Sequence, residues 1–308
     1  MGVQHQLRDN AVLSVTYVGN SNYHQSQGRN INSLTENDPH RLGVCGSACG
    51  YTGATLNANL YRPYQGWSTI APMELSANSN YNSLQVALRV TAWKNLTLNS
   101  TYTWSHAFDI IDGEIFSNIN NPFNARWDYG PAGFDRRQIS VTSFIYKFPL
   151  FRNSGSQAMK TALGGWELSG IALFESGNPL SIAAGSPDLL GLGGATGNRA
   201  NIIAPVTYPE TRFQWFSTSS FTRPGPLQWG TAARNGVVGP GRNNWNVALF
   251  KAFQVKENVR FEFRAETFNT FNHTQLSNPN TTVNSASFGQ ITGTNAPRIM
   301  QLGAKFLF

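Results

Sequence analysis

Strict two-residue alternation of apolar and polar side chains is the feature that most constrains this fold. It is plain in the last eleven residues, RIMQLGAKFLF, where a solvated terminus would instead be polar and frayed. Successive side chains of a β-strand point to opposite faces, so the segment 298–308 is predicted to be a strand with one apolar face. That face carries Met300, Leu302, Ala304, Phe306 and Phe308, and the opposite face carries Gln301, Gly303 and Lys305.

The same alternation recurs along the chain. It is clearest in NVRFEFRAETF, where Val259, Phe261 and Phe263 share one face. Charged residues alternate with them, which is typical of a strand that is apolar on one side and wet on the other. About eight strands are expected, and the fold class is all-β and antiparallel. The expected strands cover residues 11–19, 81–90, 96–105, 136–148, 163–176, 245–253, 258–268 and 298–308.

Strand lengths and connections distinguish among the all-β folds. Many of these strands have about ten residues, which suits a tilted strand crossing a bilayer better than the five or six usual in soluble sheets. Connections alternate between short and long, as in an outer-membrane barrel with short periplasmic turns and long extracellular loops. Short or moderate connections are expected at 93–95, 255–257 and 150–163, and long ones at 20–80, 107–135, 177–242 and 270–296.

Composition excludes two other classes of protein. Only 13% of the residues are charged, and the 23 Lys and Arg residues, which give a formal net charge of +7, are scattered along the chain. Nucleic-acid binding is therefore not expected, because nothing concentrates the positive field. No apolar run reaches the roughly 18 to 20 residues of a membrane helix, which leaves strands as the spanning elements. The first ten residues lack a secretory signal, so the chain is either cytoplasmic or incomplete.

Several phrases in order resemble one family. They are SNYNSLQVALRV, NLTLNSTYTWSHAFD, DYGPAGFDRRQISVTSFIYKFPL, GGWELSGIALFESGNPLSI, FRAETFNTFNHTQLSNP, FGQIT and PRIMQLGAKFLF. Together they resemble the C-terminal barrel of Oar-like TonB-dependent receptors of Gram-negative bacteria. The resemblance implies the outer membrane, a plugged barrel of about twenty-two strands, and transport energised by the TonB complex. It also implies that Phe306 and Phe308 form the C-terminal signal read by the barrel-assembly machinery.

The chain differs from this family in the segment before Ala11. We find no signal peptide, plug domain or TonB box there, and about eight strands are too few for the family's barrel. We therefore expect residues 1–308 to be a single partial barrel domain, the C-terminal fragment of a longer receptor that reaches TonB through its missing N-terminal region. A genuine small barrel is the alternative, because eight strands can close around a packed interior.

Catalytic, metal and cofactor sites are not expected. Four strand residues separate Glu262 from Glu266 by about 13 Å, too far for a glycosidase pair. Asp109, Asp112 and Glu114 lack the alternating oxygen ligands of a calcium loop, and the five histidines lack metal-binding spacing. The charged strand residues are instead expected to face a wet lumen. These lumen-facing candidates are Arg89, Arg260, Glu262, Arg264 and Glu266.

The only two cysteines, Cys45 and Cys49, lie in the first long loop. A loop exported from the cytoplasm lies in an oxidising environment, so a local disulfide is expected there.

Three functions stay open. The first is a segment of an energised transporter that takes up an unidentified solute, the second is a structural or adhesive barrel without transport, and the third is a secreted all-β binding domain. Receptors that share one barrel can differ in their loops and so bind different solutes. The sequence therefore does not identify the solute.

Overall fold

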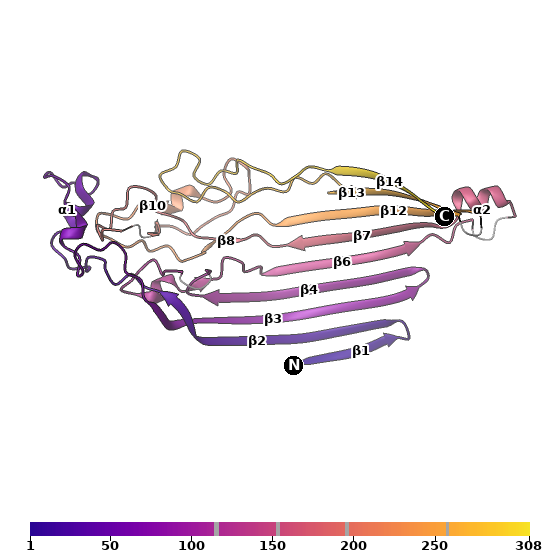
Figure 1. Cartoon of the computed structure of the whole chain (residues 1–308), viewed down its shortest axis with the longest axis horizontal. Helices are drawn as coiled ribbons and strands as arrows, with labels where there is room; N and C mark the ends of the chain where they lie inside the picture. Colours follow the sequence, from indigo (N-terminus) through magenta and orange to yellow (C-terminus); the bar gives the residue numbers. More distant parts are fainter. Residues whose placement is uncertain (114–116, 152–154, 195–196, 257–258) are drawn as a thin grey trace.

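The computed structural model describes residues 1–113, 117–151, 155–194, 197–256 and 259–308. Its main element is a ten-stranded antiparallel sheet in which nine strands follow one another along one path, and β5 (Gly130–Pro131) pairs with the fourth strand beside that path (Figure 1). The path runs β1 (Gly2–Arg8), β2 (Ala11–Gly28), β3 (Met73–Trp93), β4 (Leu96–Asp109), β6 (Gln138–Lys147), β7 (Trp166–Glu175), β12 (Arg242–Lys256), β13 (Val259–Phe268) and β14 (Ile299–Leu307).

The other elements are short and lie in the connections. They are α1 (Arg41–Cys45), η1 (Gly46–Cys49), η2 (Ala58–Leu60), η3 (Ala125–Asp128), α2 (Gln157–Leu163), β8 (Pro179–Leu180), β9 (Asn201–Ile202), η4 (Thr218–Ser220), β10 (Phe221–Thr222) and β11 (Val237–Val238). β9 pairs with β10, and β8 pairs with β11. In the described parts of the chain, no helix is long and apolar enough to cross a membrane.

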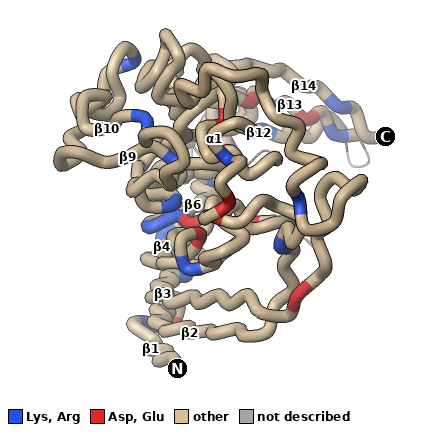
Figure 2. Tube along the Cα trace, turned by 90° about the vertical axis from the view of Figure 1, so that its left-hand side faces the viewer, with Lys and Arg blue, Asp and Glu red and all other residues tan. Residues whose placement is uncertain are grey.

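The expected all-β antiparallel class is confirmed, and the path of the main sheet has nine strands where about eight were expected. β1 was not expected, because His5 interrupts the apolar row of GVQHQLR. Figure 2 looks along the sheet from its loop end and shows it curving from β1 and β2 through β6 toward β14. Within the described residues the sheet is open, with β1 at one edge and β14 at the other.

Register aligns the alternating side chains across six neighbouring strands. Two adjacent transverse rows, from β4 to β14, differ sharply in character. We call the side of the sheet that carries the first of the two rows below the apolar face, and the side that carries the second row the polar face. The apolar-face row is Leu96, Tyr146, Leu168, Leu249, Ala265 and Leu302. The polar-face row is Thr97, Ile145, Ser169, Ala248, Glu266 and Gln301.

Short and long connections leave the sheet at opposite ends, as expected. β3 turns into β4 at Lys94 and Asn95, whose φ values of 46° and 69° are those of a type I′ hairpin turn. All four long connections lie at the other end, at the left of Figure 1. Long loops lie at the extracellular end of outer-membrane barrels, so the resemblance predicts that this end faces the outside. The turn expected at 255–257 falls partly outside the described residues.

Two expected boundaries were wrong. β2 has 18 residues and β3 has 21, so the first long connection covers 29–72 rather than 20–80. Strands of that length reach about 60 to 70 Å, roughly twice the thickness of a bilayer's hydrocarbon core, so the β2–β3 hairpin is longer than a span of a bilayer requires. At the opposite end, residues 163–165 were expected to begin a strand. Leu163 instead ends α2, and β7 begins at Trp166.

Lys251 is an exception on the apolar face. Register places it beside Trp166 and Phe263, yet only 1% of it is exposed. Its ammonium donates hydrogen bonds to the carbonyl oxygens of Ala162 at 3.0 Å and Gly164 at 2.5 Å. These are carbonyls at the C-terminal end of α2, where a cation is favoured. Lys251 thus fastens the α2 connection to the sheet.

The C-terminal strand offers a direct test of the two faces. Leu302 lies in the middle of β14 and is 74% exposed, whereas Lys305 lies on the polar face opposite Glu262. A cation on a lipid-facing side near mid-membrane costs roughly 2 to 4 kcal/mol, while lumenal changes are tolerated. In the full-length gene product, Leu302→Arg should therefore lower the outer-membrane yield far more than Lys305→Leu. If Lys305→Leu were the more damaging change, the face assignment would be wrong.

Candidate functional site

The charged residues predicted to face the lumen all lie on the polar face. On β13, Arg260 pairs with Glu262 at 2.6 Å and Arg264 pairs with Glu266 at 3.4 Å. Arg89 shares this face but lies on β3, five strands away from β13 along the sheet, so the structure does not bring it to the others. Each arginine of the β13 pairs is about half exposed, and exposed ion pairs contribute at most about 1 kcal/mol. Their lumenal role stays a prediction.

The polar face is also the hollow side of the sheet. Side chains of this face, among them Asn99, Ser143 and Asn246, line most of a hollow of about 330 Å³ across β4, β6, β7, β12 and β13. A second hollow of about 680 Å³ lies over β1 to β4 and is lined by Gln4 and Arg89 among others. Both hollows are open troughs, which identifies the polar face as the concave one.

Part of this concave face is apolar, which the sequence analysis did not anticipate. Across β6, β7, β12 and β13, apolar side chains replace the polar ones expected there. Ile171 is 51% exposed, Phe268 43% and Ile145 40%, so nothing in the described chain covers them. We call this set the lumenal apolar patch. Its members are Ile139, Val141, Ile145, Ile171, Leu173, Phe250 and Phe268.

The long connections pack together into one structure, which we call the loop cap (residues 29–72, 110–137, 176–241 and 269–298). Its centre is a cluster of buried apolar side chains. Phe216 is fully buried and makes edge-on ring contacts with Phe221 and Phe288. The cluster consists of Ile182, Ala200, Phe216, Phe221, Ala232 and Val237. The 176–241 connection therefore has a core of its own, against which Val283 and Phe288 of the 269–298 connection pack.

Two buried arginines hold the connections of the cap to one another. Arg199 lies 3.5 Å from Asp128 and stacks on Trp127, with 3.2 Å from the guanidinium carbon to the ring centroid. Burial lowers the pKa of Arg199 to about 10, and the carboxylate of Asp128 opposes that shift, so the guanidinium stays charged at neutral pH. This pair joins the 110–137 connection to the 176–241 connection.

Arg234 makes the second such link. Its Nη1 lies 2.5 Å from Asp109 Oδ1 and its Nη2 lies 2.6 Å from Asp112 Oδ2. Asp109 and Asp112, two members of the acidic cluster at 109–114, thus share one arginine as their partner, and the third member, Glu114, lies outside the described residues. The sequence offered a weak signal for both arginines, because Arg199 is the single charged residue between Asp188 and Glu210, and Arg234 is the single one between Arg223 and Arg242. A charge in such a stretch needs a partner if the fold buries it.

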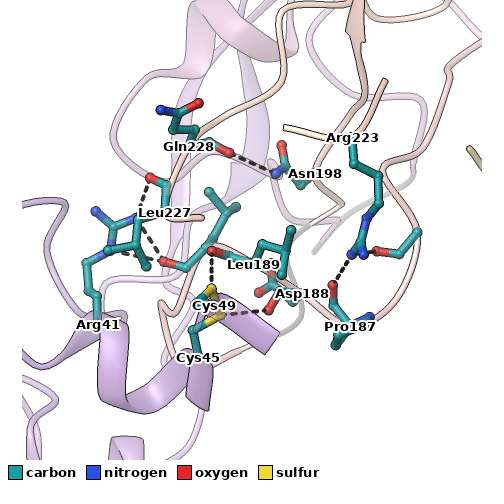
Figure 3. The surroundings of a disulfide bond; sticks show 12 residues. Arg41, Cys45, Cys49, Pro187, Asp188, Leu189, Asn198, Arg223, Leu227 and Gln228 are labelled. Atoms are coloured by element: carbon teal, nitrogen blue, oxygen red, sulfur yellow. Dashed lines mark hydrogen bonds between the residues drawn. A yellow bond between two sulfur atoms is a disulfide. The ribbon is translucent and has the colours of Figure 1, made fainter. Parts of the chain in front are cut away.

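The first connection is fastened around the cysteine pair. Cys45 and Cys49 are joined by a disulfide, and their sulfur atoms contact the carbonyls of Asp188 and Leu189 (Figure 3). Beside them Arg41 donates to the carbonyl of Leu190 at 3.0 Å. Burial lowers the pKa of the Arg41 guanidinium, and nearby carboxylates oppose that shift. These contacts therefore hold the segment 188–190 against the helical segment at 41–49.

The disulfide can be tested by counting thiols. In an exported loop we expect both cysteines to be oxidised. Full-length protein denatured without reductant should take up no maleimide label at Cys45 or Cys49, and should label both after reduction. Two labelled thiols before reduction would contradict the prediction.

Comparison with known proteins finds one matching family. Residues 1–301 match the family described as outer membrane beta barrel domain. No curated protein sequence matches the chain. Among solved structures, the outer membrane transporter YddB from Escherichia coli has a TM-score of 0.52 at 11% identity, over 100% of this chain and 32% of that one. At that identity the likeness concerns the fold alone.

Two further solved structures are more distant. The ferric-catecholate import receptor Fiu from E. coli K12 has a TM-score of 0.42 at 9% identity, over 100% of this chain and 27% of its own. FpvA from P. aeruginosa, bound to heterologous pyoverdines, has a TM-score of 0.35 at 8% identity, over 100% and 32%. The chain spans about a third of the length of these structures. The family match over residues 1–301 and the two-faced antiparallel sheet show that this protein belongs to the outer membrane beta barrel domain family and is located in the bacterial outer membrane.

Proposed function

We propose that the chain is the C-terminal part of the barrel of a TonB-dependent receptor that takes up a solute. In this proposal residues 1–308 form one partial barrel domain, and the parent protein supplies the remaining strands, a plug and the segment that contacts TonB. The free edges of β1 and β14 support the proposal, because unpaired backbone is costly in lipid and each edge needs a neighbouring strand.

The lumenal apolar patch is the observation that carries the proposal. The interior of an outer-membrane barrel is generally polar, so an exposed apolar patch on its wall marks a surface that a further part of the protein covers. Ile145, Ile171 and Phe268 are exposed on the concave face and lie around the hollow of about 330 Å³. A plug packed against this wall would bury them. The fold likeness to YddB, a transporter about three times as long, supports the same assignment.

An adhesive barrel without transport is the second candidate. It is favoured by the loop cap, which has its own core and presents large apolar side chains such as Trp67 and Phe213 to the solvent, at 67% and 71% exposure. Clusters of such residues can mark a surface that binds a partner. An adhesin, however, has no need of the lumenal apolar patch, so we place this candidate second.

Dependence on TonB separates the two candidates. Cells that express the full-length gene should deplete at least one solute from a defined medium, measured by mass spectrometry, only when TonB is present. A variant of the full-length protein that lacks only the segment that contacts TonB is the control and should behave like the TonB-deficient strain. Depletion that is identical with and without TonB, together with no co-purification of TonB with the full-length protein, would contradict the proposal.

A further inference from the structure

A small polar pocket lies at the extracellular mouth of the concave face. It has a volume of about 220 Å³ and forms where the upper ends of β7 and β12 meet the 269–298 connection. Glu175 and Arg242 are register partners at these strand ends and belong to the polar face. We call this site the mouth pocket. Its charged and amide-bearing lining residues are Arg136, Glu175, Arg242, Asn178, Gln275, Asn278 and Asn295.

The charges in the mouth pocket do not balance. Arg242 Nε lies 3.5 Å from one carboxylate oxygen of Glu175, and Arg136 Nε lies 4.0 Å from the other. Two guanidinium groups therefore share one carboxylate. In addition, Arg136 Nη1 is buried and has no hydrogen-bond partner among the described residues. A buried charged donor without an acceptor is unfavourable, and an anionic oxygen is the acceptor it fits best.

The neutral groups of the pocket are also free to bind. The side-chain amides of Asn178, Asn278 and Asn295 make no hydrogen bond within the part of the chain that the structure describes. Among the lining residues described, only Pro240 and Leu276 carry apolar side chains, and no aromatic ring is present for stacking. The pocket therefore selects by hydrogen bonds and charge. Its volume is below the range usual for drug-sized ligands, which suits a single small ring.

We propose that the mouth pocket binds the carboxylate of a small polyhydroxylated acid, the class to which sugar acids belong. The carboxylate would accept hydrogen bonds from Arg136 and Arg242, and the hydroxyl groups would exchange hydrogen bonds with the asparagine amides. The inference rests on the proposed function in one respect: the acid would be the solute, or a part of it, that the parent receptor captures.

Three probes that share one ring test this inference. Glucose, glucuronate and glucose 6-phosphate differ only at the sixth carbon, which carries a hydroxyl group, a carboxylate or a phosphate ester. Calorimetric binding to the purified full-length protein should be strongest for glucuronate. Arg136→Gln and Arg242→Gln should each weaken that binding about tenfold or more, the usual effect of losing a hydrogen bond to a charged group.

Arg137→Gln is the matched control. Arg137 is the next residue along the chain, is exposed and does not line the pocket, so its replacement should leave glucuronate binding unchanged. Heat-modifiable migration should show that all three variants fold.

Equal binding of the three probes, no binding of any, a preference for glucose 6-phosphate, or an equal loss in the Arg137 variant would each overturn the inference. Binding requires no TonB, so a failed binding test leaves the TonB experiment intact, and a failed TonB experiment leaves this one intact.

Discussion

Backbone hydrogen bonding between neighbouring strands is the constraint on which the rest of the structure depends. In lipid an unpaired amide or carbonyl finds no water, so a strand can span the bilayer only if both of its sides are paired. Every internal strand of the path from β1 to β14 has a neighbouring strand on each side. In the described chain β1 and β14 have one neighbour each, and β2 continues to Gly28, well past Thr16, where its register with β1 ends. The proposal that a longer parent protein supplies further strands rests on these edges.

Register then determines which side chains meet the lipid. Because side chains alternate, a shift of one residue in any pairing would carry that strand's polar set to the apolar face. The pairing from Leu96 across to Leu302 keeps the faces separate over six strands. The same register exposes Ile171 and Phe268 on the concave side. Their position links the geometry of the sheet to the question of what fills the barrel.

Much of the sheet could be predicted from the sequence, and most of the cap could not. The strands around Leu84, Leu98 and Phe261 were found because lipid on one side and water on the other impose strict alternation. β6 and β7 were less regular because both of their faces carry apolar residues. The role of Lys251 and the partners of Arg199 and Arg234 were missed, since each contacts segments distant in sequence and no local pattern encodes such a contact.

The central claim is that the apolar face meets lipid and the polar face meets the lumen. Fluorophores on single cysteines, in a full-length protein with Cys45 and Cys49 replaced by serine, would test it by quenching with brominated lipids. Labels at positions 249 and 302 should be strongly quenched, and labels at 248 and 301 should not, although each lies one residue away on the same strand. Equal quenching within each neighbouring pair would contradict the assignment of the two faces.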